Sequence, residues 1–382
     1  MKFNRYALSD LATIKYGKNQ KKVLSENGNI PIYGTGGLMG YATTALYDKP
    51  SVLIGRKGTI GKVKYVEHPF WTVDTLFYTI VNTDIVLPKY LYYVMSLIDL
   101  NNYNEGTTIP SLRTETLNRL EFDIPSLVEQ ETILSCLNPI DEKIALNNAI
   151  NNNLEQQAQA IFKSWFIDFE PFGGVQPPEM KFVPLQELCK VVTKGTTPTT
   201  LGKPFTSSGI NFIKAESILD SHSIDSSKFA FIDEETNALL KRSVIKANDI
   251  VFTIAGTLGR FAMVDNSVLP ANTNQAVAII RPDEKKVTPA YLYSFFIGNW
   301  HNEYYSKRIQ QAVQANLNLT TIKSLPIAVL SNTTMNNYDE LVSPLFALMK
   351  GNEEENRRLS ELRDTLLPKL MSSELDVSNI EF

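Results

Sequence analysis

The chain has 382 residues, of which 43% are hydrophobic and 20% are charged, values that are ordinary for a water-soluble protein of two or three domains. Its net charge of −4 gives no overall attraction to nucleic acid, and its two cysteines, Cys136 and Cys189, exclude a disulfide framework and favour a reducing compartment. The N-terminus lacks the apolar core of a signal peptide and no apolar run is long enough to cross a bilayer, so we expect no membrane partner.

Residues 1–125 are predicted to form a first globular module. It begins with a helix-like stretch from Leu8 to Tyr16, followed by a basic turn that carries Lys18, Lys21 and Lys22. A short strand at 30–34 then runs into a glycine-rich loop that contains Thr35. Glycine permits positive φ and a close approach of the backbone to a partner, so this loop is a candidate contact surface.

A second glycine-rich loop follows the apolar stretch 51–55 and carries Arg56 and Lys57. It resembles a phosphate-binding P-loop, but five residues separate Gly55 from Gly61 where four are required, and Val63 stands where a Ser or Thr is needed. We therefore reject nucleotide binding and predict a tight basic hairpin that presents its two cations to DNA.

The rest of this module is predicted to be a strand at 74–81, a helix at 88–100 and a polar loop at 101–113. The loop offers hydroxyl groups and backbone donors without an excess of fixed charge, which suits contacts to phosphates and to base edges. Its candidate contact residues are Thr107, Thr108 and Arg113.

Residues 126–170 are predicted to form one long helix. Apolar residues recur at alternating spacings of four and three, interrupted by Asn147 and Asn151, which is typical of a helix that pairs with another helix. The aromatic residues Trp165, Phe166 and Phe169 lie near its end. The proline- and glycine-rich linker 171–178 cannot continue the helix.

Residues 179–330 repeat the first module in weaker form. The stretch DIVFTIAGTLGRF at 249–261 aligns without gaps on SVLIGRKGTIGKV at 51–63, and 287–293 matches 86–92. The repeats agree in their expected strands and differ in their loops, where Arg56-Lys57 is replaced by Ile254-Ala255. This pattern indicates two similar modules that recognise different targets.

Residues 331–373 repeat the long helix at an offset of 205, which places Asn352 on Asn147, and a short tail at 374–382 follows. Each helix carries an apolar stripe that must be covered, so we expect the two to pair, with the polar middle positions fixing their register. The alternative is that they are two amphipathic core helices of one ordinary globule.

Charge is segregated along the chain. Residues 1–125 carry 14 Lys+Arg and 11 Asp+Glu, and 176–330 carry 16 and 13, so both modules have a net charge of +3. The helical segments 126–175 (2 and 7) and 331–382 (5 and 10) each have a net charge of −5. Basic modules and acidic helices are expected if the modules bind phosphates and the helices bind protein, although ordinary surface variation is an alternative.

No catalytic or metal site is expected. The three histidines, His68, His222 and His301, have no partner at metal-ligand spacing, and the sequence has no Gly-x-Ser-x-Gly elbow and no glycine-rich loop for S-adenosylmethionine. The chain therefore reads as a binding and scaffolding protein and not as an enzyme.

The Gly-Thr-Ile-Gly and Gly-Thr-Leu-Gly hairpins, the helix end IFKSWFIDF at 161–169 and the terminal LLPKLM at 366–371 resemble specificity (S) subunits of type I restriction–modification systems. The resemblance implies an α+β fold in which two similar mixed α/β target-recognition domains are separated by two long helices. These helices would form an antiparallel coiled coil, and the chain would have a pseudo-two-fold internal repeat.

The same resemblance implies that each module reads one half of a split site on double-stranded DNA. It also implies that two methyltransferase (M) subunits bind the chain and that restriction (R) subunits join the complex. S-adenosylmethionine and ATP would be bound by those partners, so no cofactor is expected on this chain. The expected location is the cytoplasm of a bacterium or archaeon, in association with the nucleoid.

From position and chemistry, the DNA-contact candidates are the basic and hydroxyl-bearing loop residues of both modules. In the first module they are Lys18, Lys21, Lys22, Thr35, Arg56, Lys57, Thr107, Thr108 and Arg113, and in the second Lys194, Thr196, Thr197, Lys214, Glu216, Arg260, Asn316 and Asn318. Trp165, Phe166 and Phe169 are the candidates for M-subunit binding, with the alternative that they only close the end of the helix pair.

Two other classes of function stay open on the sequence. One is a coiled-coil adaptor whose basic modules bind protein or RNA, and the other is a stand-alone enzyme with an unrecognised site. A DNA shift assay in the presence of the M subunit separates the first from a specificity subunit, and methyl transfer by the chain alone would support the second.

Overall fold

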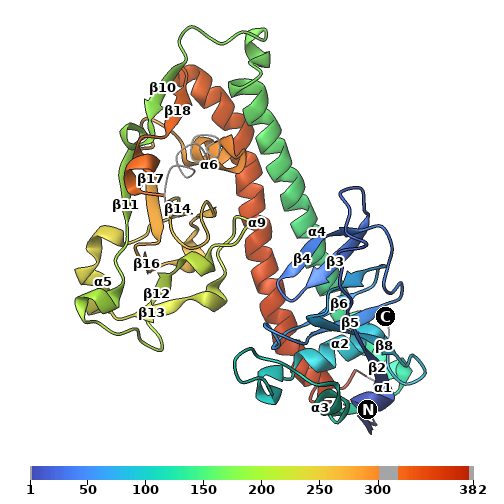
Figure 1. The fold of residues 1–382 in the computed structure, drawn as a ribbon. Helices are drawn as coiled ribbons and strands as arrows, with labels where there is room; N and C mark the ends of the chain where they lie inside the picture. Colours follow the sequence, from blue (N-terminus) through green and yellow to red (C-terminus); the bar gives the residue numbers. More distant parts are fainter. Residues whose placement is uncertain (1, 301–316, 378–382) are drawn as a thin grey trace. The chain divides into compact units, whose positions relative to one another are not determined.

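The computed structural model describes residues 2–300 and 317–377, and the chain divides into two compact units (Figure 1). Unit 1 comprises Met1–Leu146 and Glu355–Phe382, and unit 2 comprises Asn147–Glu354. Each unit therefore contains one predicted module together with one segment of each long helix. The fold class is α+β, as the sequence predicts.

Unit 1 is built on three small sheets. A four-stranded antiparallel sheet has the order β2-β8-β5-β6, a three-stranded sheet has the order β4-β3-β7, and β1 pairs with β9. The strands are β1 Asn4–Ala7, β2 Ala12–Tyr16, β3 Ile30–Gly34, β4 Gly37–Ala42, β5 Ser51–Gly55, β6 Val63–Val66, β7 Trp71–Thr72, β8 Leu76–Val81 and β9 Glu121–Ile124. The short helices are α1 Leu8–Leu11, α2 Pro88–Ser96, η1 Leu100–Tyr103 and α3 Thr114–Asn118.

The predicted helix from Leu8 to Tyr16 is wrong. Only Leu8–Leu11 is helical, and Ala12–Tyr16 is strand β2, which pairs with β8. The β-branched residues Thr13 and Ile14 favour a strand, and the open edge of β8 offers backbone partners that local periodicity does not reveal. The predicted helix at 88–100 is also too long, because α2 ends at Ser96.

Unit 2 repeats this topology. Its four-stranded sheet has the order β11-β17-β14-β15, its three-stranded sheet has the order β13-β12-β16, and β10 pairs with β18. The strands are β10 Lys181–Pro184, β11 Cys189–Lys194, β12 Ile210–Ile213, β13 Ala230–Ile232, β14 Ile250–Thr253, β15 Phe261–Met263, β16 Ala271–Thr273, β17 Val277–Pro282 and β18 Pro326–Val329. The helices are α5 Glu234–Leu239, α6 Pro289–Ile297 and α8 Leu319–Lys323, with 3-10 turns at η2 Glu170–Phe172, η3 Leu185–Leu188, η4 Pro198–Leu201, η5 Ala215–Ser217, η6 Ser226–Lys228, η7 Lys241–Ser243 and η8 Asn266–Val268.

The internal duplication that the sequence predicts is therefore confirmed at the level of strand pairing. Even the parallel pair of the small sheet recurs, as β3 with β7 in unit 1 and as β12 with β16 in unit 2. The strand at the edge of each four-stranded sheet, β2 or β11, is followed directly by an equivalent glycine, Gly17 or Gly195. A Cβ at these positions would lie 2.0 Å from the Val73 carbonyl oxygen and 1.8 Å from that of Thr273, respectively.

The two long helices also begin alike. Helix α4 is Leu127–Phe166 and helix α9 is Asn332–Met371. The hydroxyl group of Ser126 accepts from the Glu129 amide (3.4 Å) and that of Ser331 from the Thr334 amide (3.3 Å), so serine residues 205 positions apart cap both helices. Glu129 also accepts from the Ser126 amide, which completes a capping box.

Helices α4 and α9 contact one another within each unit. In unit 1, Arg363 Nη1 donates to Asp141 Oδ1 at 3.1 Å, and Lys143 Nζ lies 3.2 Å from Glu355 Oε2. In unit 2, Asn352 Nδ2 donates to Asn151 Oδ1 at 2.7 Å, so the side-chain contact expected between polar seam positions is present at this pair. Asn151 in turn donates to the Met349 carbonyl (3.1 Å).

Segments of both helices belong to the main core of each unit. In unit 1, Leu137 and Leu367 are buried with Phe77, Tyr90 and other residues of the four-stranded sheet and α2. In unit 2, Phe162 and Tyr338 are buried with Phe252, Tyr291 and Phe296. Among the described residues, no helix combines the length and the apolar composition needed to span a membrane.

The duplicated glycines provide a test of this packing. Gly17→Ala or Gly195→Ala would drive a methyl group into a backbone carbonyl, so we expect each to lower the free energy of unfolding by about 1–3 kcal/mol. Gly36→Ala is the control, because a Cβ there has no atom within 4 Å. Urea unfolding followed by circular dichroism measures the difference, and equal stability of Gly17→Ala and Gly36→Ala would contradict the packing described.

Candidate nucleic-acid interface

Arg56 lies at the end of β5 and is held between two other loops of unit 1. Its Nη1 donates to the Asp74 carbonyl (2.8 Å), and its guanidinium carbon lies 5.1 Å from the centroid of the Tyr16 ring. The Arg56 amide donates to the Thr75 carbonyl (2.8 Å), which ties the backbone to the same loop. These contacts are to a carbonyl oxygen and an aromatic ring, neither of which carries a formal charge, so the positioned guanidinium group can still bind phosphate or guanine.

The loop after Arg56 packs on the polar loop that precedes α3. Lys57 pairs with Ser111 in an isolated antiparallel bridge, and the Gly58 amide donates to the Pro110 carbonyl (2.9 Å). This pairing brings the exposed residues Thr107 and Thr108 into the same region as Lys57. The two loops were predicted separately and form one surface.

Thr35 and the lysine turn belong to the same group of loops. A Cβ on Gly58 would lie 3.8 Å from Thr35 Oγ1, so the β3–β4 turn is beside the Arg56 loop. Trp71 Nε1 donates to the Lys18 carbonyl (2.8 Å), which anchors the turn that carries the exposed residues Lys21 and Lys22 to the small sheet. The structure thus gathers most first-module candidates into one surface with several exposed cations.

Arg113 differs from the other first-module candidates. Its Nε lies 3.1 Å from Glu105 Oε2, and Glu105 also accepts a hydrogen bond from the Thr116 hydroxyl. This ion pair neutralises the guanidinium group in the free protein. Arg113 is therefore a weaker candidate for DNA contact than Arg56.

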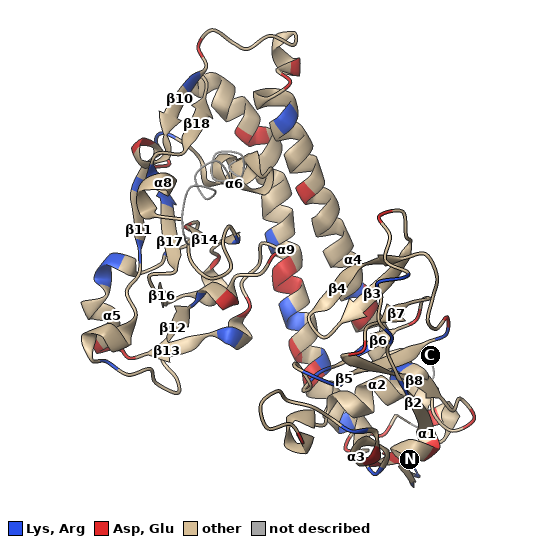
Figure 2. Cartoon of the chain, in the orientation of Figure 1, with Lys and Arg blue, Asp and Glu red and all other residues tan. Residues whose placement is uncertain are grey.

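In unit 2 two of the three predicted cations are paired with acidic residues. Arg260 forms a bidentate ion pair with Asp220 through Nε (2.7 Å) and Nη2 (2.6 Å), and Lys214 Nζ lies 2.8 Å from Glu216 Oε1. Figure 2 marks the basic and acidic residues of the described chain. Lys194 is exposed at the end of β11.

The remaining second-module candidates have local structural partners. Arg242 Nη2 donates to Thr196 Oγ1 (3.4 Å), and the Thr197 hydroxyl donates to the side chain of Gln275. Asn318 caps α8 by accepting from the Thr321 amide (2.7 Å). Asn316 lies outside the described residues.

The three aromatic candidates for partner binding are not equivalent. Phe166 is 4% exposed and packs edge to face on Tyr291 and Tyr338, inside the core of unit 2. Trp165 and Phe169 are only partly buried against the same core. For Phe166 the structure favours the alternative that it closes the end of the helix pair, because its ring has no free face for a partner.

The sequence reading missed the residues that position or neutralise the candidates. Tyr16 and Asp74 hold Arg56, and Asp220 neutralises Arg260 from 40 residues away in the chain. Such pairs have no local sequence signature, since their contact depends on how the loops fold back on the sheets. Only the tertiary structure reveals them.

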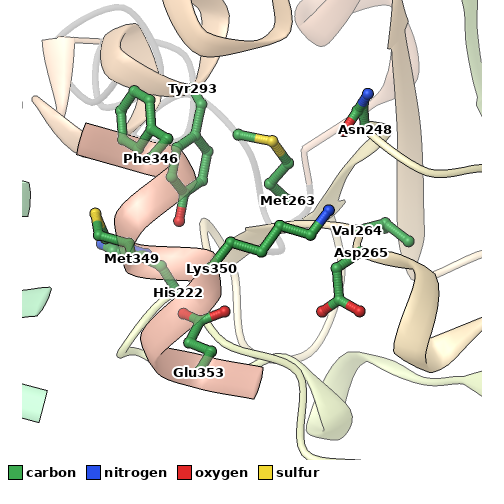
Figure 3. Close-up of a pocket in the computed structure, with 10 residues that line it drawn as sticks. All are labelled: His222, Asn248, Met263, Val264, Asp265, Tyr293, Phe346, Met349, Lys350 and Glu353. Carbon is green, nitrogen blue, oxygen red and sulfur yellow. The ribbon is translucent and has the colours of Figure 1, made fainter. Parts of the chain in front are cut away.

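A small cavity of about 70 Å³ lies in unit 2 between α9 and the loop after β15 (Figure 3). Its lining includes His222, Tyr293, Lys350 and Glu353. The volume has room for a few water molecules only. Among the described residues, no group of three His, Cys, Asp or Glu side chains is placed to hold a metal ion.

Two partly buried titratable residues lie beside this cavity. His222 Nε2 is 3.8 Å from Glu155 Oε1 on α4, and the His222 ring stacks on Phe261. Burial raises the pKa of the Glu155 carboxyl group, while a hydrogen bond from Gln159 opposes the shift. Burial lowers the pKa of His222, which favours the neutral form of its ring.

Comparison with known proteins agrees with the geometry. A model of the type I restriction modification DNA specificity domain matches residues 2–156 and again residues 177–330. The chain belongs to this family. The specificity subunit of the type I restriction enzyme MjaIX from Methanocaldococcus jannaschii is 26% identical over 88% of this chain and 80% of its own length.

Two further relatives extend the comparison. The specificity subunit of the HindI enzyme from Haemophilus influenzae is 25% identical and covers 82% of this chain and 84% of its own length. The crystal structure of a type I S subunit from M. genitalium superposes with a TM-score of 0.56 at 17% identity, covering 97% of this chain and 96% of that one. The similarity to this crystal structure shows that the two chains share a fold.

The raised pKa of the partly buried Glu155 predicts a pH-dependent stability. A carboxyl group whose pKa is raised on folding stabilises the fold below its ordinary pKa and loses that contribution as pH rises through the raised value. Glu155→Gln keeps an oxygen acceptor for Gln159 and removes the charge, so we expect the variant and the wild type to be equally stable near pH 4 and the variant to be the more stable near pH 7.

Denaturant unfolding between about pH 4 and 8 measures the difference in free energy of unfolding. Glu340→Gln, an exposed substitution on α9, is the control and should show no such trend. A constant difference between Glu155→Gln and the wild type across this range would contradict the raised pKa.

Proposed function

We propose that this chain is the DNA specificity subunit of a type I restriction–modification complex and that each of its two modules reads one half of a split DNA site. The duplication carries this proposal, because the same strand topology occurs twice while the loops at equivalent positions carry different side chains. A repeated scaffold with divergent loops is suited to reading two different half-sites.

We further propose that α4 and α9 form an antiparallel coiled coil that sets the distance between the half-sites. The contact of Asp141 with Arg363 in unit 1, and that of Asn151 with Asn352 in unit 2, support pairing within each unit. Forty residues at about 1.5 Å each give a helix of roughly 60 Å, which bounds the spacing at roughly 18 base pairs.

The chemistry of the complex is proposed to reside on partner subunits. Two methyltransferase subunits would bind the acidic helices and carry S-adenosylmethionine, and restriction subunits would add ATP-dependent steps. The net charge of −5 on each helical segment supports a protein-binding role for the helices and argues against DNA contact there. The proposed location is the cytoplasm of a bacterium or archaeon.

The two modules would bind DNA with different electrostatics. In unit 1, Arg56 is positioned by a backbone carbonyl and an aromatic ring, so DNA can bind its guanidinium group without first displacing a carboxylate. In unit 2, Arg260 is bound to Asp220, so a phosphate or base must replace that carboxylate before Arg260 contributes. We therefore expect Arg56 to contribute more to affinity than Arg260 does.

A DNA shift assay with the purified chain and its M subunit tests the proposed function. Mapping the methylated positions across the source genome supplies the cognate site and shows whether it is split. Specific binding to a bipartite sequence supports the proposal, and binding without sequence preference in the presence of the M subunit contradicts it.

Substitution of Arg56 tests whether each module reads one half-site. Arg56→Ala should weaken binding to the cognate site by about 1–3 kcal/mol if the guanidinium group contacts a base. The loss should disappear on DNA already altered in the half-site that module 1 reads, and persist on DNA altered in the other half. Competition binding to the three DNAs measures these effects.

Arg5→Ala is the matched control, because this side chain is 67% exposed and pairs with Glu121 on the separate β1–β9 sheet. It should leave the affinity for all three DNAs unchanged. A loss of equal size at both half-sites for Arg56→Ala would contradict the assignment of one half-site to each module.

Substitution of the polar pair tests the proposed coiled coil. Asn151→Leu alone leaves Asn352 without its side-chain partner and should lower the free energy of unfolding by about 1 kcal/mol. The double variant with Asn352→Leu replaces both and should recover that loss while relaxing the register of the helices. Unfolding curves and binding to sites whose spacer is one base pair longer or shorter measure both effects.

If the double variant binds the altered spacers no better than the wild type, the polar pair does not fix the register. A single variant as stable as the wild type would show that the hydrogen bond makes no net contribution.

A further inference from the structure

The β3–β4 hairpin of unit 1 exposes an apolar surface. Leu38 is 54% exposed, Met39 is 53% exposed and Tyr41 is 45% exposed, and all three lie on β4. Leu24, which is 52% exposed, lies beside this strand, since its Cδ1 would be 2.9 Å from a Cβ on Gly40. Several exposed apolar side chains on one short hairpin favour an interaction site.

This hairpin carries no charge and is narrow. Residues 27–47 contain no Asp, Glu, Lys or Arg. The strands pair from Ile30 with Ala42 to Gly34 with Gly37, so only two residues form the turn. β3 also pairs with β7, through Ile32 and Tyr33, so β4 is the edge strand of a three-stranded sheet. The major groove of DNA admits a two-stranded β-ribbon, which matches the width of this edge hairpin.

Two cationic segments border the hairpin. Residues 11–25 contain four lysines and no acidic residue, and residues 49–66 contain five Lys or Arg and no acidic residue. The first segment is hydrogen-bonded to β4, because the Ser25 amide donates to the Tyr41 carbonyl (3.0 Å) and the Thr43 amide to the Val23 carbonyl (3.0 Å). An apolar strip between cationic segments matches the chemistry of base edges between phosphates.

The second cationic segment reaches the hairpin at its other strand. Lys64 Nζ lies 3.9 Å from the centroid of the Tyr33 ring, and the Gly58 loop adjoins Thr35. Burial lowers the pKa of Lys64, whereas the exposed Lys57 extends from the same segment. Cations are thus held beside both strands of the uncharged ribbon by contacts within the module.

We propose that the β3–β4 hairpin enters a groove of the DNA and places Leu38 and Met39 in apolar contact with bases, while the bordering lysines and Arg56 contact phosphates. This inference rests on the proposed function, because it assumes that unit 1 reads DNA. Thymine methyl groups are the apolar features that such side chains recognise in the major groove. The hairpin is then a specificity-determining element distinct from the polar loops of the same module.

The counterpart in unit 2 is the antiparallel pair β12 and β13, which is built differently. The segment between β12 and β13 is long and charged, with Lys214, Glu216, Asp220, Asp225 and Lys228. The apolar contact is therefore confined to one half-site. The two modules use different kinds of side chain at the same place in the same scaffold.

The test is the double substitution Leu38→Ser with Met39→Ser in the full chain assembled with its M subunits. Both side chains are exposed, so the fold should be retained. Affinity for the cognate site should fall roughly tenfold, while binding to non-specific DNA and the dependence of affinity on salt should not change. Lys57→Ala should instead reduce the salt slope by about one unit.

Leu97→Ser is the matched control, because Leu97 is 45% exposed at the end of α2 and lies outside the hairpin. It should bind like the wild type. Replacement of each thymine of the half-site by uracil completes the experiment: a uracil that weakens the wild type and has no further effect on the double variant identifies the contacted methyl group.

Three outcomes would overturn the inference. Unchanged cognate affinity of the double variant shows that the hairpin does not contact bases, and a changed salt slope shows that its effect is electrostatic. Loss of M-subunit assembly shows that the apolar surface binds protein. Absence of specific binding by the wild type is different, since it contradicts the proposed function itself.

Discussion

The structure depends on the burial of helix segments in the core of each unit. Neither module closes its core with its own strands: unit 1 requires Leu137 of α4 and Leu367 of α9, and unit 2 requires Phe162 and Tyr338 from the same two helices. Polar contacts reinforce the arrangement in unit 1, where Asp141 accepts from Arg363 and from the hydroxyl group of Tyr93. Because a helix with an apolar stripe is unstable alone, helices and modules stabilise one another.

The duplication shows which features the scaffold fixes and which it leaves free. Strand β5 of unit 1 and strand β14 of unit 2 are equivalent, and each begins at or just after a fully buried polar residue. This residue is Ser51 in unit 1 and Asp249 in unit 2, so its chemistry differs. Ser51 donates to the Thr79 carbonyl (2.8 Å), whereas Asp249 accepts two hydrogen bonds from Arg281 (2.7 Å each). A buried polar group must be paired, and either solution meets that requirement. The scaffold thus constrains pairing and not residue type.

The loops differ between the units in how their cations are held. A carboxylate already paired with an arginine, as in Asp220 with Arg260, must be displaced or carried along when the arginine binds a phosphate. A cation held by a carbonyl oxygen and an aromatic face, as Arg56 is, keeps its full charge for the ligand. Similar basic compositions therefore give modules with different surface chemistry, which the net charge of +3 for each does not reveal.

The sequence by itself determined the repeat and the two long helices, because periodic apolar spacing and an ungapped internal match can be read directly from the chain. The family followed from the resemblance of its hairpin and helix-end motifs. The sequence prediction failed at Ala12–Tyr16, where pairing with β8 decides for a strand. For Phe166 it left two roles open, and packing on Tyr291 and Tyr338 favours the core. Only the tertiary structure joined the loops of Thr35, Arg56 and Thr107 into one surface and paired Arg260 with Asp220. These contacts join residues that are far apart in the sequence. They form only when the loops fold onto the sheets, and no local sequence pattern encodes that folding.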